Sequence, residues 1–215
     1  MVDDTIDKKS ETCPDYWYVN EKVARSPPSI HRYANKWGDL RGACIYGKEQ
    51  NRIYLNRGPS EKPQFVDAAT PLGVTELTNS RGAASADFQN QGREDLLFTH
   101  QFWAPTLYRN VYAGKMDAPE WIGFEFESLD PRCNREAIGT RVELHVEKKD
   151  GSHFDLSHET QMVSGFSAQS DKRVHFGLGH DVKSIRAKVN WCLMHDQVLT
   201  DLTPGSYHKI VWNKE

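Results

Sequence analysis

The chain has 215 residues, with 27 basic and 30 acidic side chains and a formal charge of −3. This length is enough to bury a sizeable core in one large domain or two small ones. Lysine and arginine are scattered along the sequence, which argues against a nucleic-acid-binding surface. No apolar run reaches the roughly 18 residues of a membrane-spanning helix, so we expect no membrane partner.

The N-terminus and the cysteines bear on where the protein works. Residues 1–12 are charged and without periodicity, so we predict a disordered tail. As written, this start is no signal peptide. We therefore expect a cytoplasmic protein, or a secreted one if a leader has been removed. The four cysteines contain no C-x-x-C pair, which argues against a zinc site: Cys13, Cys44, Cys133 and Cys192. Two disulfides in any of three pairings stay open, and we prefer free buried thiols.

Residues 13–118 contain short strand-like runs separated by turns. The runs lie at residues 54–56, 65–67, 81–88 and 95–98. Tyr108-Arg109-Asn110 repeats the Tyr54-Leu55-Asn56 pattern at a spacing of 54 residues, which fits one β-propeller blade. This segment resembles FG-GAP/VCBS propeller repeats, and the resemblance implies about two blades. Because propellers close with four to eight blades, two would leave strand edges uncovered, and we expect a homo-oligomer.

From residue 119 onward, apolar and polar residues alternate with the period of strands that bury one face. The alternating runs lie at residues 122–126, 142–146, 154–156, 174–178, 185–191, 197–202 and 207–212. Asp150-Gly151 supplies the positive φ angles of a tight hairpin turn. Helix signals are nearly absent. We therefore predict an all-β protein, with a second β module over residues 119–215.

Three pieces of this module carry a second resemblance. Asn134-Arg135-Glu136-Ala137-Ile138-Gly139 comes first, Gly165-Phe166 and Gln169 follow, and Arg173-Val174-His175-Phe176-Gly177-Leu178-Gly179 comes last. In this order they resemble the ASPIC/UnbV domain, which is known from cartilage acidic protein and from bacterial proteins. The resemblance runs from about Trp121 to Trp212. It implies a short propeller-like region followed by an ASPIC/UnbV-like β module.

A candidate metal site comes from the FG-GAP resemblance. Residues 87–95 align with the D-x-D-x-D-G-x-x-D calcium loop of that family, with Asp87, Gln89, Gln91 and Asp95 at ligand positions. Calcium takes six to eight hard oxygens, and the two glutamines remove two charges. We expect a weak or lost calcium site. The alternative is a metal-free turn held by hydrogen bonds of Asp87 and Asp95. No other cofactor is expected.

The matching motifs consist of strand residues and glycines, and no catalytic constellation accompanies them. Ser164-Gly165-Phe166-Ser167 lacks the G-x-S-x-G frame of a nucleophile elbow. The resemblance therefore implies a non-catalytic binding or interaction module. Its ligand, whether a small molecule, a carbohydrate or a protein, stays open.

The alternative is a cofactor-independent cyclase or isomerase of a natural-product pathway. His175 and Asp171 are its candidate acid–base groups. Alternation predicts His175 on the strand face opposite to Val174 and Phe176. Candidate ligand contacts are Trp103 in the apparent loop 101–105, Phe166 and Gln169, because aromatic residues in loops commonly line ligand sites.

Overall fold

The computed structural model describes residues 49–56, 64–78, 80–100, 103–111, 118–166 and 168–213. The predicted tail, Cys13 and Cys44 lie outside these ranges. The described residues form fourteen β-strands and no α-helix, which confirms the predicted all-β class. None of them belongs to a helix that could cross a membrane.

The chain forms two compact units. Described residues of the first unit fall within Met1–Gly82 and Phe98–Thr106, and those of the second within Ala83–Leu97 and Leu107–Glu215. The second unit therefore contains the turn that follows residue 86 together with the whole C-terminal module.

The strands before residue 111 form three small sheets. They are β1 (Glu49–Gln50) with β4 (Leu77–Thr78), β2 (Tyr54–Asn56) with β3 (Phe65–Asp67), and β5 (Ser80–Ala86), β6 (Asp95–His100) and β7 (Trp103–Tyr108) in that order. The predicted runs at residues 54–56 and 65–67 pair antiparallel, with Tyr54 opposite Asp67. Among the described residues before residue 112, the sheets have two or three strands and form no closed propeller.

Strand β7 corrects one expectation about the apparent loop 101–105. Trp103, Ala104 and Pro105 belong to a strand. The sheet order places β7 at an edge, where the missing N–H of Pro105 need not interrupt a ladder of hydrogen bonds. Residues 101–102 and the side chain of Trp103 lie outside the described part of the structure.

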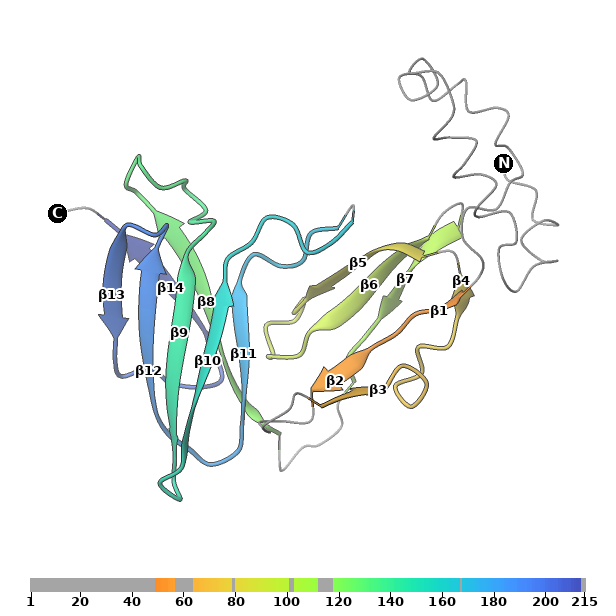
Figure 1. Ribbon diagram of the computed structural model, residues 1–215, viewed down its shortest axis with the longest axis horizontal. Coiled ribbons are helices and arrows are strands. Elements are labelled where there is room, and N and C mark those ends of the chain that lie inside the picture. The colour runs from red at the N-terminus through yellow and green to blue at the C-terminus, as the bar shows by residue number, and fades with distance from the viewer. Residues whose placement is uncertain are drawn as a thin grey trace, which may run out of the picture. The chain divides into compact units, whose positions relative to one another are not determined.

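The C-terminal module is a sandwich of two sheets (Figure 1). Its strands are β8 (Glu120–Ser128), β9 (Arg141–Lys148), β10 (His153–Glu159), β11 (Val174–Gly179), β12 (Val182–Trp191), β13 (His195–Leu199) and β14 (Tyr207–Trp212). One sheet has the order β10-β9-β12-β13 and the other the order β11-β8-β14. The alternating runs predict all seven strands. Strand β13 overlaps the predicted run at residues 197–202 but starts and ends a few residues earlier.

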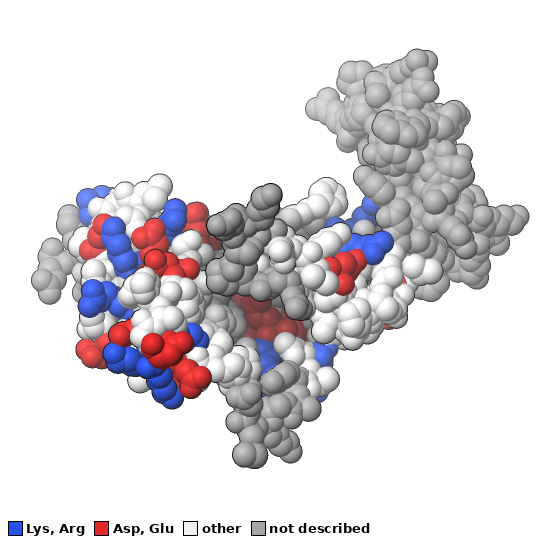
Figure 2. Space-filling model, turned by 60° about the horizontal axis from the view of Figure 1, so that its bottom comes forward, with Lys and Arg blue, Asp and Glu red and all other residues white. Residues whose placement is uncertain are grey.

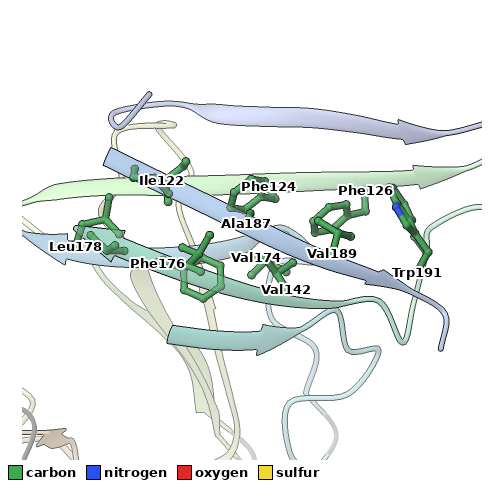
Figure 3. Close-up of a cluster of buried hydrophobic side chains, with 14 of the residues drawn as sticks. Ile122, Phe124, Phe126, Val142, Val174, Phe176, Leu178, Ala187, Val189 and Trp191 are labelled. Atoms are coloured by element: carbon green, nitrogen blue, oxygen red, sulfur yellow. The ribbon is translucent and has the colours of Figure 1, made fainter. Parts of the chain in front are cut away.

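One hydrophobic core lies between these two sheets (Figure 3). Alternate residues of each strand point into it, as the period of two requires. The inward residues of the central strands are Ile122, Phe124 and Phe126 of β8, and Ile185, Ala187, Val189 and Trp191 of β12. Trp191 is fully buried and Phe176 is 5% exposed, so the predicted inward faces of β11 and β12 are confirmed.

The predicted hairpin at Asp150-Gly151 is also confirmed. Strands β9 and β10 pair antiparallel on either side of it, with His153 opposite Glu147. Gly151 adopts a φ of 85°, a conformation that glycine reaches without steric cost. The Asp150 carboxylate accepts hydrogen bonds from the backbone N–H and the hydroxyl of Ser152, which closes the turn.

The expectation of free thiols is wrong for two of the four cysteines. Cys133 and Cys192 form a disulfide, with their Cα atoms 5.9 Å apart. That separation is in the usual range for a disulfide. The bond ties the loop after β8 to the turn after β12. Residues 59 positions apart in sequence meet there, so sequence spacing alone did not reveal the pair.

Candidate functional site

The candidate site occupies the outer face of the sheet β11-β8-β14. Because Ile122, Phe124 and Phe126 point into the core, the alternate residues of β8 point outward. The pairing register places His175 and Tyr207 on either side of Gly123. Lys209 lies opposite Glu125 on the neighbouring strand β14. The outer face thus has an aromatic half and a charged half.

A turn at residues 87–92 packs on the aromatic half. A Cβ atom on Gly92 would lie 2.2 Å from the indole ring of Trp121, and Gly92 has a φ of +71°. On the strand below, a Cβ atom on Gly123 would lie 2.2 Å from the ring of Tyr207. Both glycines are therefore needed for close approach: one brings the turn onto Trp121, and the other lets Tyr207 lie flat on the sheet.

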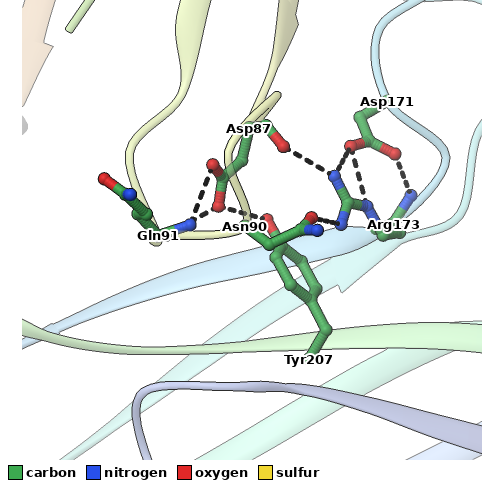
Figure 4. Close-up of polar contacts among 7 residues, drawn as sticks. Asp87, Asn90, Gln91, Asp171, Arg173 and Tyr207 are labelled. Atoms are coloured by element: carbon green, nitrogen blue, oxygen red, sulfur yellow. Dashed lines mark hydrogen bonds and ion pairs between the residues drawn. The ribbon is translucent and has the colours of Figure 1, made fainter.

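The Asp87 carboxylate holds this turn together from within (Figure 4). Asp87 is 1% exposed. It accepts hydrogen bonds from the backbone N–H groups of Gln91 at 3.1 Å and Gly92 at 2.6 Å, and from the Tyr207 hydroxyl at 3.2 Å. A buried carboxylate with three donors is well satisfied, so the turn and β14 are joined through it.

Arg173, the residue just before β11, fastens the same turn. Its Nη2 donates to the backbone carbonyl of Asp87 at 2.9 Å, and its Nη1 donates to the side-chain oxygen of Asn90. Its Nε donates to the Asp171 carboxylate at 2.8 Å. The guanidinium also lies 4.0 Å from the centre of the Tyr207 ring, a cation–π distance. We call Asp87, Asn90, Asp171, Arg173 and Tyr207 the turn clamp.

The clamp shifts the pKa values of its members. Burial would raise the pKa of Asp87, but the N–H groups of Gln91 and Gly92 and the Tyr207 hydroxyl together hold it below its usual value. Burial raises the pKa of Tyr207, and the neighbouring Asp87 carboxylate raises it further. The hydrogen bond to Asp171 raises the pKa of Arg173. Each shift favours the protonation states that form the clamp.

The expected calcium ligands lie in or beside this turn. Asp87 is engaged as described, and Asp95 accepts a hydrogen bond from the Asn110 N–H at 2.7 Å. Gln89 and Gln91 are exposed. Within the described ranges, no three His, Cys, Asp or Glu side chains are grouped so as to hold a metal ion. That calcium binding is weak or lost stays a prediction.

The clamp leads to a prediction about acid stability. The pKa of Asp87 is lower in the folded protein than its unfolded value of 3.8. Its contribution to the free energy of unfolding is therefore complete above that value and is lost as the pH falls below it. We expect Asp87→Asn to lose less stability than the wild type between about pH 5 and about pH 2, measured by urea unfolding. Glu94→Gln, a change of an exposed side chain near the same turn, is the control. If Asp87→Asn loses as much unfolding free energy over this pH range as the wild type, the prediction is wrong.

The charged half of the outer face forms an open groove of about 750 Å³. Glu125, Glu127 and Lys209 lie on the sheet, and loop residues stand on either side. Its other lining residues are Phe126, Arg135, Glu136, Gln169, Ser170, Asp171, Lys172 and Arg173. We call this the charged groove. Four acidic and four basic side chains line it, so its net charge is zero.

The charges of this groove pair with one another. Lys209 Nζ lies 3.0 Å from Glu127 and 3.8 Å from Glu125, and Arg135 Nε lies 3.2 Å from Glu127. Lys172 pairs with Glu136. The hydrogen bond from Lys209 holds the pKa of Glu127 below its usual value. The face in Figure 2 likewise shows basic and acidic residues interleaved, without a broad area of one sign.

The loop at residues 134–139 builds one wall of the groove. The Asn134 side chain accepts a hydrogen bond from the Ile138 N–H at 2.8 Å and donates one to the Ile138 carbonyl at 3.0 Å. Ala137, within the loop, is fully buried in the core of the module. The asparagine, alanine and isoleucine of the motif are therefore structural, and they present Arg135 and Glu136 to the groove.

The loop between β10 and β11 builds the other wall. The Ser164 N–H donates to the Ala168 carbonyl at 3.2 Å, and the hydroxyls of Ser164 and Ser170 are 3.0 Å apart. Ser170 and Asp171 also bond to the backbone of Ser85, at 3.1 and 2.9 Å. The loop is thus ordered by its own hydrogen bonds, and it leaves Phe166 78% exposed at its tip.

The two residues proposed for acid–base chemistry have different partners in the structure. His175 lies on the outer face, as alternation predicts, and stacks on Trp121 with ring centres 5.5 Å apart. Asp171 is bound by Arg173 instead. The Nε2 atom of His175 is buried and has no hydrogen-bond partner among the described residues. Of the predicted ligand contacts, Gln169 lines the charged groove, and Phe166 is 78% exposed in the same loop.

The residues of this face include several that were not among the predicted site residues. Trp121, Arg173, Tyr207 and Lys209 all lie at outward positions of their strands or just before them. Arg173 belongs to the recognised motif, and period-two alternation places the others outside. Their partners are distant in sequence, however, and only the fold reveals them.

By architecture, the second unit contains a two-sheet β-sandwich with loops that frame a charged groove on one outer face. Its sequence agrees with this class. Residues 130–215 match the family model described as ASPIC and UnbV. This match does not extend into the segment that resembles FG-GAP repeats. No curated protein sequence matches the chain.

Proposed function

We propose that the chain is a non-catalytic protein-interaction module that contacts its partner through the charged groove and the loop tip at Phe166. The observation that carries the proposal is that Phe166 is 78% exposed in the same loop as Gln169 and Ser170, which line that groove. Met162 and Val163 in the same loop are 52% and 63% exposed. A large aromatic side chain held out in this way is the usual anchor of a protein interface.

The order of the loop favours tight contact. Hydrogen bonds from Ser164 to Ala168 and between Ser164 and Ser170 already restrict the loop before any partner arrives. A preordered loop loses less conformational entropy on binding than a flexible one. The turn clamp supports the same wall, because Asp171 and Arg173 line the groove and also hold the turn at residues 87–92.

The charge of the groove favours a protein partner over a polyanion. Its lining carries equal numbers of acidic and basic side chains, so it would not attract nucleic acid or an anionic membrane. Exposed ion pairs contribute about 0–1 kcal/mol each, so a partner with both charges can exchange them at little cost. The cyclase or isomerase alternative has less support, because Arg173 binds the carboxylate of Asp171.

We also propose that the residues before this module are FG-GAP-type repeats. The support is the β2–β3 hairpin, which joins the Tyr-x-Asn and Phe-x-Asp runs as the resemblance implies. Pairing of open sheet edges between copies would then explain a homo-oligomer.

The proposal is tested by panning phage-displayed random peptides on the immobilised full chain. We expect enriched peptides whose affinity falls about tenfold or more with Lys209→Glu and with Phe166→Ala, as for interface anchors. Leu193→Ala is the matched control, because Leu193 is an 82% exposed apolar residue on the turn after β12. Enriched peptides that bind all three variants like the wild type would reject the groove and loop as the contact surface.

A further inference from the structure

We infer that the outer face of the sheet β10-β9-β12-β13 holds a separate site for an oxyanion, centred on Arg186. This face carries its own open groove of about 540 Å³. We call it the sheet groove. The charged side chains and the histidine that line it are Arg141, Glu143, His145, Asp155, Arg186 and Lys188. The inference does not depend on the proposed protein-interaction surface, which lies on the other sheet.

The strand register fixes the place of Arg186. Its neighbours Ile185 and Ala187 are 5% and 0% exposed, so they point into the core and Arg186 points outward. Arg186 lies opposite His145 of β9, and His145 lies opposite Asp155 of β10. Since β9 and β12 are the two central strands of the sheet, Arg186 stands on a rigid part of the scaffold.

Arg186 differs from its charged neighbours because it has no ion-pair partner within the described ranges. Arg141 Nε lies 3.2 Å from Glu143, Lys188 Nζ lies 2.9 Å from Asp196, and His145 Nδ1 lies 2.7 Å from Asp155. In the parts of the chain that the structure describes, neither a carboxylate nor a carbonyl binds the guanidinium of Arg186. The charged groove on the other sheet differs in this respect, because each of its four basic side chains forms an ion pair with a carboxylate.

The chemistry of a free guanidinium identifies the ligand class. Its planar fork of N–H donors matches two oxygens of a carboxylate, a sulfate or a phosphate. Lys188 and Arg141 lie on the same face as Arg186. The groove lining therefore contains three basic side chains and two carboxylates, which gives it a net positive charge. The hydroxyl of Ser157, which also lines the groove, adds a donor for a third oxygen. The ligand is therefore a small oxyanion or an oxyanion group of a larger molecule.

The test follows the Arg186 Nε–H signal by NMR while the full chain is titrated with sodium sulfate or sodium acetate. Sodium chloride keeps the ionic strength constant, which removes general screening. We expect a saturating shift with at least one of the two anions. Saturation by sulfate alone assigns the site to tetrahedral oxyanions, and saturation by acetate alone assigns it to carboxylates.

Variants separate a built site from general attraction of anions. Backbone N–H signals of β9 and β12 report binding where the Arg186 side chain is changed. Arg186→Gln is expected to weaken binding about tenfold or more, and Arg186→Lys is expected to restore only part of it, because lysine keeps the charge without the fork. Arg135→Gln, which removes an 83% exposed arginine from the charged groove, should leave binding unchanged. Shifts that do not saturate with either anion, or that Arg186→Gln leaves intact, would overturn the inference.

Discussion

Replacing Trp191 with alanine is expected to lower the free energy of unfolding by about 3–5 kcal/mol, the range for large buried aromatic side chains. Trp191 is fully buried between the two sheets. Its ring packs edge-on against Phe126 at 5.3 Å and lies 5.8 Å from Trp212. Its indole N–H donates to Gln197 at 2.9 Å. The substitution therefore removes core contacts from three strands and leaves a cavity that the rigid sheets cannot fill.

The measurement is urea unfolding followed by far-ultraviolet circular dichroism, because the substitution itself alters tryptophan fluorescence. Val198→Ala is the control, since Val198 is 60% exposed on the edge strand β13 and should change stability by about 0.5 kcal/mol or less. Trp191→Phe should fall between the two, because it keeps most of the packing and loses the hydrogen bond to Gln197. A Trp191→Ala effect no larger than that of Val198→Ala would show that this residue is not central to the core.

Removing the disulfide between Cys133 and Cys192 is expected to have a comparable effect. The bond closes a loop of 59 residues, and the entropy of closing such a loop in the unfolded chain corresponds to about 4 kcal/mol. The double variant Cys133→Ala/Cys192→Ala tests this without leaving a free thiol in the module. Its free energy of unfolding should be lower than that of the oxidised wild type by about this amount.

Reduction provides the control for this second prediction. A reducing agent should bring the wild type close to the double variant, and the double variant should respond little to the same agent. If the wild type unfolds at the same urea concentration with and without reducing agent, the bond does not contribute to stability. A large response of the double variant would instead point to Cys13 or Cys44.

Local sequence was sufficient for the strands of the C-terminal module. A strand places successive side chains on opposite faces, so alternation at residues 122–126, 174–178 and 185–191 predicts both the strand and its buried side. The outward position of His175 follows from the same rule. The hairpin at Asp150-Gly151 was predictable because a positive φ angle is a property of the residue and its neighbours.

The site depended on contacts that alternation does not encode. Arg173 binds the carbonyl of Asp87 from 86 positions away, and Tyr207 binds the Asp87 carboxylate from 120 positions away. Asp171 is predicted from sequence as an acid–base group, but its position two residues before Arg173 gives it an ion pair instead. Trp103 was assigned to a loop, yet it lies in β7, an edge strand that tolerates Pro105.

The sequence by itself determined an all-β chain, the strands of its sandwich, and the identity of the residues in the core. These properties depend on side-chain polarity and on turn residues that act within a few positions. Only the tertiary structure decided that Gly92 lies against Trp121, that Cys133 meets Cys192, and that Arg186 has no partner among the described residues. Each of these depends on how strands from distant parts of the chain align, and a shift of one residue in register would move every such side chain to the opposite face.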